Sequence, residues 1–331
     1  MQFPDLHRHL GGATHPRILW GYVDKHPGDH ATRLRRRYPD YASFAAVFER
    51  PFTDLADYLT VHHLVEGLQA EDPGYFTTRA VRGASVFESI DYLELRFNPY
   101  KRTPAGLPEA DRLALMGDVA RQVIAAARTE FPIRTTFLLC MDRGFSPDLN
   151  RRIIDAAERL PEVVGVDLAG PYQPGGPTPE QWRDLYGDAR SRGLRTTAHM
   201  AESDPEDIHP DLFPLLDRIG HGIQIGLHRP DLLPELAARG ICLEVCPATY
   251  LRTNTLRDVA ELGPVFERCA TAGVPIAICT DNPALHGESG RIVNEFERLV
   301  RADVFHFDAI LTYAAEGYRH AFAGPPVPGA A

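Results

Sequence analysis

The sequence predicts an α/β protein built as a (β/α)8 TIM barrel with extra helices inserted after the first strand. Eight short runs of apolar and β-branched residues recur along the 331 residues, and amphipathic segments with helical spacing separate the later ones. Strand–helix alternation at this spacing indicates parallel βαβ units, and eight such units suffice to close a barrel. The composition, 44% hydrophobic and 24% charged, is that of an ordinary globular protein.

Each predicted strand is a short apolar run, as expected for strands buried in a barrel. In chain order they are Gln2–His7, Tyr92–Phe97, Arg134–Cys140, Val163–Leu168, Arg195–Ala198, Arg218–His221, Ile241–Val245 and Pro275–Cys279. The helical segments between the later strands often begin with proline and end near glycine, as helices prefer. They are Leu107–Glu130, Pro179–Arg192, Pro205–Leu216, Pro230–Ala238 and Pro264–Ala272.

The gap between the first two strands, from about residue 10 to residue 91, is too long for a single crossover. Residues 41–48 and 55–68 have helical apolar spacing, so we expect inserted helices over the barrel mouth, where active sites of such barrels form. From these helices we expect side chains near the pocket mouth, namely Phe44, Phe48, Leu59 and His62 or His63. Residues 1–323 are interpreted as one hydrolase domain, and the Pro/Gly/Ala-rich tail 324–331 is predicted to be flexible.

Charge and amino-acid usage exclude several function classes. The net charge of −10 and the isoelectric point of about 5.8 argue against a nucleic-acid-binding protein, which needs a basic surface. Lysine occurs twice, as Lys25 and Lys101, and neither lies in an apolar strand-like run, which argues against Schiff-base chemistry. No apolar stretch reaches the ~18 residues of a membrane span, so no membrane partner is expected.

The five cysteines favour a reducing compartment. Their number is odd and their spacing irregular, and four of them lie within or at the ends of apolar runs; they are Cys140, Cys242, Cys246, Cys269 and Cys279. This pattern is typical of buried free thiols rather than of a disulfide framework. The N-terminus lacks the features of a signal peptide, so we expect a cytoplasmic protein.

Four residues at the ends of predicted strands are candidate ligands of one metal ion. His7 and His9 alternate along the first strand, so both side chains point to the same side, and Gly11-Gly12 lets the backbone turn closely past a ligand. His199 and Asp281 each follow a strand-like run. His-x-His alone is a weak motif, but the joint occurrence at strand ends is not. Three imidazoles and one carboxylate suit zinc, which can acidify a water for hydrolysis.

Two further residues have the chemistry that such a hydrolysis needs. Glu202 stands three residues after His199, which can place a carboxylate beside the metal, although a surface glutamate is equally compatible with this spacing. His221 lies between glycines after a short apolar run, where a lone histidine is more often structural. A histidine near the ion could orient the attacking water, and a carboxylic acid could donate a proton to a ring nitrogen of the substrate.

The chain resembles the adenosine deaminase family of the amidohydrolase superfamily. The resemblance runs nearly end to end, through Asp5-Leu6-His7-Arg8-His9-Leu10, Tyr92-Leu93-Glu94-Leu95-Arg96-Phe97, Val166-Asp167-Leu168-Ala169-Gly170, His199-Met200-Ala201-Glu202, Arg218-Ile219-Gly220-His221-Gly222, Glu244-Val245-Cys246-Pro247 and Thr280-Asp281-Asn282-Pro283. It implies one zinc ion held by His7, His9, His199 and Asp281. It also implies Glu202 as the proton shuttle, His221 as the base that orients the water with help from Asp281, and the Gly170 backbone as a substrate contact.

The departures from the family pattern concern substrate recognition. Gly11 stands where the family usually has an acidic residue that binds the ribose 5′-hydroxyl, and Asn282 stands where a second aspartate binds the purine. An asparagine amide can still donate to a ring nitrogen. After Cys246-Pro247 the chain reads Ala248-Thr249-Tyr250 in place of the usual Ser-Asn pair. The resemblance therefore predicts an aminohydrolase that releases ammonia from a purine-like base or nucleoside other than plain adenosine.

Two other interpretations remain open from the sequence. One is hydrolysis of a non-purine C–N bond at the same mononuclear site, in an amide, an amidine or a related aminoheterocycle. A bridging lysine of binuclear relatives is absent from the predicted fourth strand, Val163–Gly170, which favours one metal ion. The other is a non-catalytic binder that keeps the barrel and its pocket. The zinc pattern of cytidine deaminases, with Pro-Cys-x-x-Cys, is absent.

Overall fold

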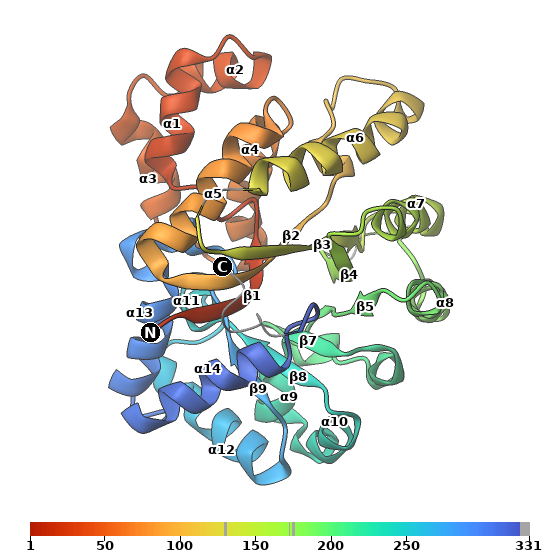
Figure 1. Cartoon of the computed structure of the whole chain (residues 1–331). Helices are drawn as coiled ribbons and strands as arrows, with labels where there is room; N and C mark the ends of the chain where they lie inside the picture. Colours follow the sequence, from red (N-terminus) through yellow and green to blue (C-terminus); the bar gives the residue numbers. More distant parts are fainter. Residues whose placement is uncertain (129–130, 172, 174–175, 325–331) are drawn as a thin grey trace.

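The computed structural model describes residues 1–128, 131–171, 173 and 176–324, and it has the parallel strands and surrounding helices of a (β/α)8 barrel (Figure 1). The strands are β1 (Phe3–His9), β2 (Ile90–Phe97), β3 (Arg134–Asp142), β4 (Val163–Ala169), β5 (Arg195–Thr196), β6 (His199–Met200), β7 (Arg218–His221), β8 (Cys242–Val245) and β9 (Ile276–Ile278). Every predicted strand is present, so the predicted fold class is confirmed.

The barrel closes between its first and last strands. Neighbours pair in chain order from β1 to β5 and again from β6 to β9. The predicted fifth strand, Arg195–Ala198, is shorter in the structure, where β5 ends at Thr196 and a separate strand, β6, begins at His199. Between the two strands the backbone N–H of Thr197 still donates to the carbonyl of Val166 on β4, at 3.1 Å. At the closing seam the N–H of Asp281 donates to the carbonyl of His7 at 2.7 Å, and the N–H of His9 donates to the carbonyl of Asp281 at 2.8 Å.

Five helices lie between β1 and β2, as the long first gap predicts. They are α1 (Pro16–Lys25), α2 (Asp29–Arg37), α3 (Tyr41–Glu49), α4 (Leu55–Gln69) and α5 (Pro73–Glu88). The last three begin at aspartates, Asp40, Asp54 and Asp72, whose side chains accept a backbone N–H of the first turn. In Figure 1, α1 to α4 project from one end of the barrel.

The inserted helices have a hydrophobic cluster of their own, distinct from the barrel core. Phe44 and Phe48 on α3 belong to it and are buried, with Phe44 packed against Trp20 and Tyr38 at ring distances of 5.4 and 5.6 Å. The prediction that Phe44 and Phe48 lie at the pocket mouth is therefore wrong. The apolar face of α3 is turned toward its neighbours in the insertion, where two aromatic rings bury more surface than they would at an open mouth.

The remaining helices cover the barrel. They are α6 (Glu109–Ala127), α7 (Pro147–Glu158), α8 (Pro179–Ser191), α9 (Ile223–His228), α10 (Leu233–Arg239), α11 (Pro247–Arg252), α12 (Gly263–Ala272), α13 (Ile292–Arg301) and α14 (Ile310–Arg319). The predicted helices at 107–130, 179–192 and 264–272 correspond to α6, α8 and α12, although the predicted end at Glu130 lies outside the described residues. The segment 230–238 begins as a 3-10 turn, η4 (Pro230–Leu232), and continues as α10.

One predicted helix is wrong. Residues 205–216 form two 3-10 segments, η2 (Pro205–Asp207) and η3 (Pro210–Leu215), instead of a single α-helix. Pro210 and Pro214 lack the N–H that an α-helix interior needs, so the apolar spacing there does not propagate a helix. The interpretation of residues 1–323 as one domain stays a prediction. Residues 325–331 of the predicted flexible tail lie outside the described part of the chain.

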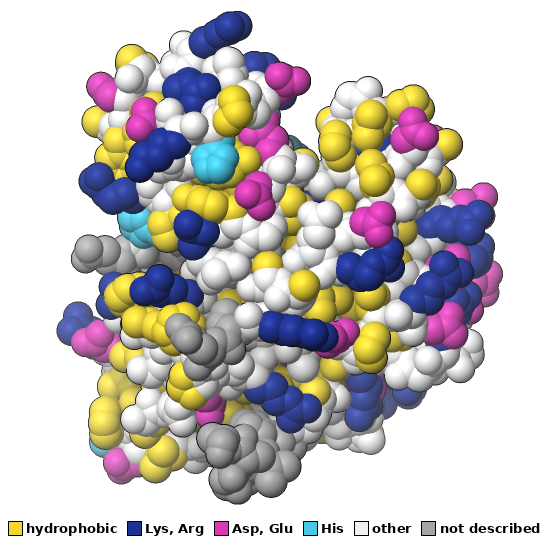
Figure 2. Space-filling model, turned by 45° about the horizontal axis from the view of Figure 1, so that its top comes forward, with side chains coloured by type: hydrophobic (Ala, Val, Ile, Leu, Met, Phe, Trp, Pro, Cys, Tyr) yellow, Lys and Arg dark blue, Asp and Glu magenta, His cyan; other side chains and the backbone are white. Residues whose placement is uncertain are grey.

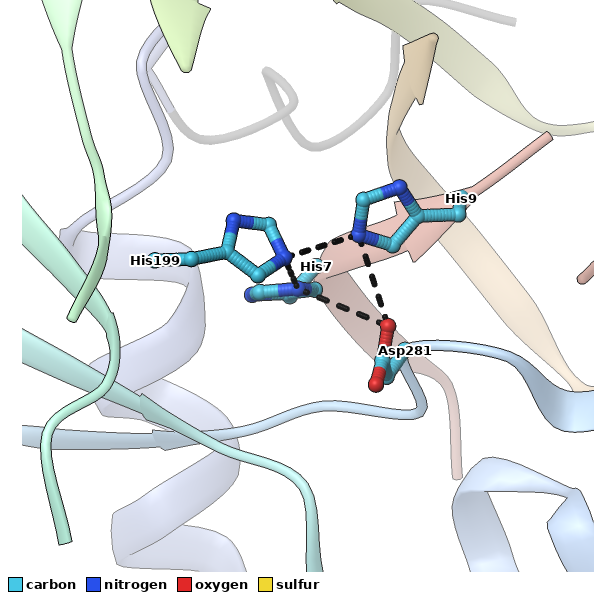
Figure 3. Close-up of side chains that lie close together, drawn as sticks. All are labelled: His7, His9, His199 and Asp281. Atoms are coloured by element: carbon cyan, nitrogen blue, oxygen red, sulfur yellow. Dashed lines mark hydrogen bonds and ion pairs between the residues drawn. The ribbon is translucent and has the colours of Figure 1, made fainter. Parts of the chain in front are cut away.

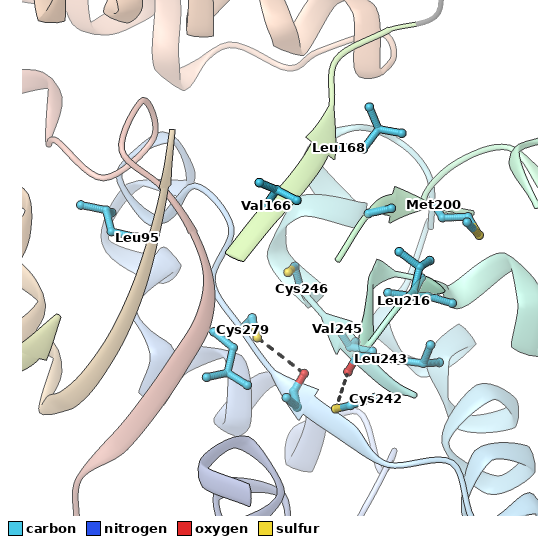
Figure 4. Close-up of a cluster of buried hydrophobic side chains, with 14 of the residues drawn as sticks. Leu95, Val166, Leu168, Met200, Leu216, Cys242, Leu243, Val245, Cys246 and Cys279 are labelled. Carbon is cyan, nitrogen blue, oxygen red and sulfur yellow. Dashed lines mark hydrogen bonds between the residues drawn. The ribbon is translucent and has the colours of Figure 1, made fainter. Parts of the chain in front are cut away.

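The barrel core is packed from strand residues such as Leu95, Val166, Leu168 and Leu243, which are drawn in Figure 4. All five cysteines are free and buried, as predicted, and three of them lie in this view beside the core strands β8 and β9. None of the described helices is long and apolar enough to cross a membrane. On the face drawn in Figure 2, acidic and basic side chains are intermingled and do not gather into one basic patch.

Candidate active site and metal centre

Four side chains from three distant parts of the sequence meet at the carboxyl ends of the strands (Figure 3). His7 and His9 lie on β1, His199 begins β6, and Asp281 follows β9. Nε2 of His199 lies 3.2 Å from Nε2 of His7 and 2.9 Å from Nε2 of His9. Oδ1 of Asp281 lies 3.6 and 3.4 Å from the same two nitrogens. The structure therefore brings together all four residues that the sequence singled out as candidate ligands.

Two of these rings are held from behind by buried carboxylates. Nδ1 of His7 lies 2.7 Å from Oε2 of Glu244, and Nδ1 of His199 lies 3.1 Å from Oδ2 of Asp167. Since a carboxylate only accepts, each ring keeps a proton on Nδ1 and is left with a lone pair on Nε2. Arg96 joins the two carboxylates, with Nη1 donating to Asp167 at 3.1 Å and Nη2 donating to Glu244 at 2.8 Å. Metal-binding histidines usually have such carboxylate partners.

The spacing of the donor atoms fits one zinc-sized cation. Zn–N bonds of about 2.1 Å in a tetrahedral arrangement put two nitrogens roughly 3.4 Å apart, close to the distances between the three Nε2 atoms. Lone pairs held at this separation repel unless a cation lies among them. The donor set, three imidazole nitrogens and one carboxylate oxygen, is also one that zinc accepts. The residues present therefore fit a zinc ion.

Both oxygens of Asp281 are anchored. Thr249 Oγ1 donates to Oδ2 at 2.8 Å, and the amide nitrogen of Asn282 donates to Oδ1 at 2.6 Å. Burial raises the pKa of Asp281 to about 6. Asn282, which was expected to bind substrate, thus lines the cavity and at the same time holds the candidate carboxylate ligand.

The histidines of the cluster differ in the direction in which their pKa values are shifted. Burial lowers the pKa of His7 and of His9 well below the ordinary value, so both rings are neutral, as a metal ligand has to be. Burial also acts to lower the pKa of His199, but the ion pair with Asp167 outweighs it and raises the pKa. In turn, His199 and Arg96 overcome the effect of burial and lower the pKa of Asp167, which stays ionised. The His199 ring is therefore paired with an ionised carboxylate, that of Asp167, on the side away from the other ligands.

Glu202 and His221 face the same cluster. Oε2 of Glu202 lies 3.6 Å from Nε2 of His221, and the His221 ring is 4.9 Å from that of His7 and 5.2 Å from that of His199. Burial, followed by the charge of Asp281, raises the pKa of Glu202 to about 8. A carboxyl group with this pKa is largely protonated at neutral pH and can donate a proton. Burial lowers the pKa of His221 well below its ordinary value, so the imidazole is neutral.

The backbone takes the left-handed conformation at each of these strand ends. φ is +54° at Ala201, +67° at His221 and +58° at Asp281, which side chains other than glycine rarely adopt. At Gly170 φ is +83°, and a Cβ there would lie 2.7 Å from Oδ2 of Asp142, so this position requires glycine. Such conformations cluster at functional sites because they aim side chains that a regular strand would turn elsewhere.

A cavity of about 370 Å³ opens beside the cluster. The three predicted substrate contacts, Gly11, Gly170 and Asn282, all line it, and so do Leu59, His62 and His63 of α4, as predicted for the pocket mouth. A Cβ on Gly11 would lie 3.1 Å from Nδ1 of His62 and 3.7 Å from Nη2 of Arg102. Even a methyl group at position 11 would therefore press on the His62 ring, so α4 approaches the end of β1 closely at this glycine.

Sequence reasoning did not assign the residues behind the candidate ligands. Arg96, Asp167 and Glu244 are fully buried, and Arg218 donates from Nε to Oε1 of Glu244 at 2.7 Å. Each is a charged residue in the middle of an apolar strand run. This pattern could have identified them as interior residues, because a charged side chain within a barrel strand has to be paired with an opposite charge in the interior. The partner of each charge depends on strand order and could not be read from spacing.

Known proteins resemble this chain over most of its length. A family model described as adenosine deaminase matches residues 4–327. An adenine deaminase of Cupriavidus necator is 27% identical over 290 residues, which cover 86% of this chain and 77% of that protein. An aminodeoxyfutalosine deaminase of Streptomyces avermitilis is 28% identical over 288 residues, which cover 86% of this chain and 76% of that protein.

A zinc-bound amidohydrolase of Burkholderia ambifaria has the same fold. Its solved structure superposes with a TM-score of 0.74 and 25% identity, covering 97% of this chain and 86% of that one. The family match extends from β1 to beyond α14 and includes all four candidate ligands. The protein is thus a hydrolase of carbon–nitrogen bonds other than peptide bonds, from a metal-using group of enzymes, and it belongs to the adenosine deaminase family.

Proposed function

We propose that this protein is a zinc-dependent aminohydrolase that replaces the exocyclic amino group of a purine-like base or nucleoside with oxygen and releases ammonia. The observation that carries the proposal is the convergence of His7, His9, His199 and Asp281 beside a cavity that also contains Glu202 and His221. Two relatives that match most of this chain are named adenine deaminase and aminodeoxyfutalosine deaminase. Their names support an amino-bearing purine-like substrate.

The metal would be one zinc ion per chain, held by the three Nε2 atoms and by Oδ1 of Asp281. When bound, zinc supplies acidity to the attacking water, whose pKa it brings to about 7. Glu244 and Asp167 support the site by fixing two of the ligand rings. His221 faces the space next to the cluster and is in position to hold the water for attack.

Glu202 would move the proton that the substrate ring needs. Its raised pKa keeps a proton on the carboxyl group, which can be donated to a ring nitrogen as the water oxygen adds to the neighbouring carbon. Asp281 would serve both as ligand and as a hydrogen-bond acceptor for the water. The balance of the reaction is one water consumed, one C–N bond broken and one ammonia released.

The substrate is proposed to differ from plain adenosine. Gly11 offers no side-chain acceptor to a ribose hydroxyl, and the side chains nearest to it are those of His62 and Arg102. Gly170 and Asn282 line the cavity in which the purine-like ring would lie. The buried free thiols support a reducing compartment, and we propose that the enzyme works in the cytoplasm.

Ammonia release by the zinc-loaded protein tests the proposal. The panel holds adenine, adenosine, 2′-deoxyadenosine, 5′-modified and N6-substituted adenosines, and non-purine aminoheterocycles. We expect turnover of at least one modified aminopurine, with a kcat/KM above that for adenosine, and a kcat roughly 10²- to 10⁴-fold lower in Glu202→Gln. If zinc is bound and no member of the panel releases ammonia, the proposal is wrong.

A further inference from the structure

Tyr250 contacts the Nδ1 edge of the His221 ring, the edge at which His7 and His199 each meet a carboxylate instead. It lies on α11 directly after β8 and is fully buried. Its phenol oxygen accepts the backbone N–H of Cys246 at 3.1 Å and lies 3.3 Å from Nδ1 of His221. The two rings meet edge to face at 5.6 Å. It is the third residue after Cys246-Pro247, in the segment where this chain departs from the Ser-Asn pair of the family pattern.

The positions of the hydrogens on Tyr250 and His221 follow from which groups around them can donate and which can accept a hydrogen bond. The Cys246 amide can only donate, so the phenol oxygen is the acceptor in that contact. The phenol hydrogen then needs an acceptor, since a buried donor left unpaired costs about 1–3 kcal/mol. Among the described residues, Nδ1 of His221 is the acceptor that this oxygen reaches. The O–H of Tyr250 therefore donates to Nδ1, and Nδ1 carries no proton of its own.

We propose that Tyr250 is a positioning residue that locks His221 in the tautomer with its proton on Nε2. This inference rests on the proposed function for its catalytic meaning, but the tautomer itself does not depend on turnover. Nε2 of His221 is buried and has no hydrogen-bond partner among the described residues, and the nearest carboxylate oxygen, on Glu202, is 3.6 Å away. The Nε2–H is therefore free to point into the space beside the cluster.

A histidine in this tautomer donates to the attacking water. A nitrogen that already bears a hydrogen cannot take a proton from water, so His221 fixes the water by its oxygen lone pair and does not serve as the base. The proton that the water loses has to go to a carboxylate oxygen, which is that of Asp281, or that of Glu202 after Glu202 has donated its own proton to the substrate ring. This differs from the assignment of His221 as a base that the family resemblance implies.

Two readouts test the inference, and the first does not require activity. Side-chain ¹⁵N–¹H correlation spectra of ¹⁵N-histidine-labelled, zinc-loaded protein report which ring nitrogen carries the proton, and a His221→Gln variant assigns the resonance. We expect protonated Nε2 and bare Nδ1 in the native protein. In Tyr250→Phe, which keeps the ring but lacks the donor, we expect the proton to distribute over both nitrogens.

The second readout is kinetic. With the best substrate of the ammonia panel, Tyr250→Phe should lower kcat by roughly 10- to 100-fold, as loss of an orienting hydrogen bond does, with KM within about twofold of native. Tyr186→Phe is the matched control, because Tyr186 is equally buried and its hydroxyl donates at 2.7 Å to the carbonyl of Thr197, away from the cavity. It should change neither the tautomer nor kcat.

The outcomes separate the two proposals. A native spectrum with the proton on Nδ1, or a tautomer unchanged in Tyr250→Phe, overturns the inference even if the protein deaminates the panel. If the panel is inert, the proposed function fails while the spectrum still identifies the tautomer. Should Tyr250→Phe not fold, as judged by its thermal transition, the native spectrum alone decides which nitrogen of His221 carries the proton.

Discussion

The carboxylate of Asp167 lies 3.1 Å from Nδ1 of His199, while Nε2 of the same ring faces His7 and His9. The aspartate thereby sets both the orientation of the ring and the nitrogen that is free to bind a metal. The same carboxylate accepts from Arg96, which also reaches Glu244 behind His7. Three side chains that never face the substrate thus determine the shape of the candidate metal centre.

Asp167→Asn should weaken metal binding. An asparagine at this position no longer compels the proton onto Nδ1 of His199, and it leaves the charge of Arg96 less well paired. We expect zinc affinity to fall roughly 10- to 100-fold, measured by competition with a chromogenic chelator. Asp142→Asn is the matched control, since Asp142 ends the neighbouring strand but pairs with Lys101. An unchanged affinity in Asp167→Asn would contradict the supporting function of Asp167.

Removal of one candidate ligand should remove the metal. His9→Ala is expected to reduce bound zinc from one ion per chain to almost none, measured by elemental analysis after dialysis. The control is His63→Ala, whose side chain is 64% exposed and lies outside the ligand cluster. A chelator should lower the melting temperature of the native protein, because an ion that binds only the folded state stabilises it. Full zinc retention by His9→Ala would disprove its assignment as a ligand.

Glu202→Gln should separate binding from chemistry. The amide keeps the shape of the side chain but cannot donate and recover a proton, so kcat is expected to fall by roughly 10²- to 10⁴-fold. Glu202 is not among the four candidate ligands, so zinc content should remain that of the native protein. Ammonia release and metal content measured on the same preparation check both statements, and near-native turnover would rule out the shuttle.

The pH profile should lose activity on the alkaline side. Burial and Asp281 raise the pKa of Glu202 to about 8, so the acid form that donates is present below pH 8 and disappears above it. We therefore expect kcat/KM for the best substrate to decline with rising pH through 8. The measurement is a profile from pH 6 to 10 at constant ionic strength. An activity that rises between pH 8 and 9 would contradict the assignment of protonated Glu202 as the proton donor.

Gly11→Asp should redirect substrate preference. A carboxylate here would sit beside His62 and Arg102 and would bring a negative charge into the cavity. Its field should disfavour substrates with an anionic 5′-substituent, so the ratio of kcat/KM for adenosine over its 5′-monophosphate should rise. Gly11→Ala adds the steric bulk without the charge, and it should change both substrates alike. Equal ratios in the two variants would show that charge at this position does not matter.

The strand ends were predictable, whereas the environment of each side chain was not. His7, His199 and Asp281 follow apolar runs, and the strands of a barrel all end on one rim, so their convergence followed from the pattern. The interruption between β5 and β6, from Thr196 to His199, could not be predicted from the sequence, because the residues there are as strand-like as their neighbours. The burial of Phe44 depended on the orientation of α3 within the insertion, which periodicity does not determine.

The supporting network escaped prediction for a similar reason. A charged residue in an apolar strand indicates that an oppositely charged partner lies in the interior. The partners of Arg96, however, are Asp167 and Glu244, which lie 71 and 148 positions further along the sequence. Which of the many carboxylates these are depends on the order of the strands and on their register. The contact of Tyr250 with His221 likewise depends on how α11 leaves β8, a turn that the sequence marks only by Pro247.

The closing seam of the barrel has a consequence for how the molecule is made. Asp281 is hydrogen-bonded through its backbone to His7 and His9, so the first strand can be completed only by a residue near the other end of the chain. During synthesis, one edge of β1 stays unpaired until the segment about 270 residues further along the chain has been made, because no earlier segment supplies its second neighbour. The four candidate ligands likewise come together only when this seam has closed, because Asp281 is one of them.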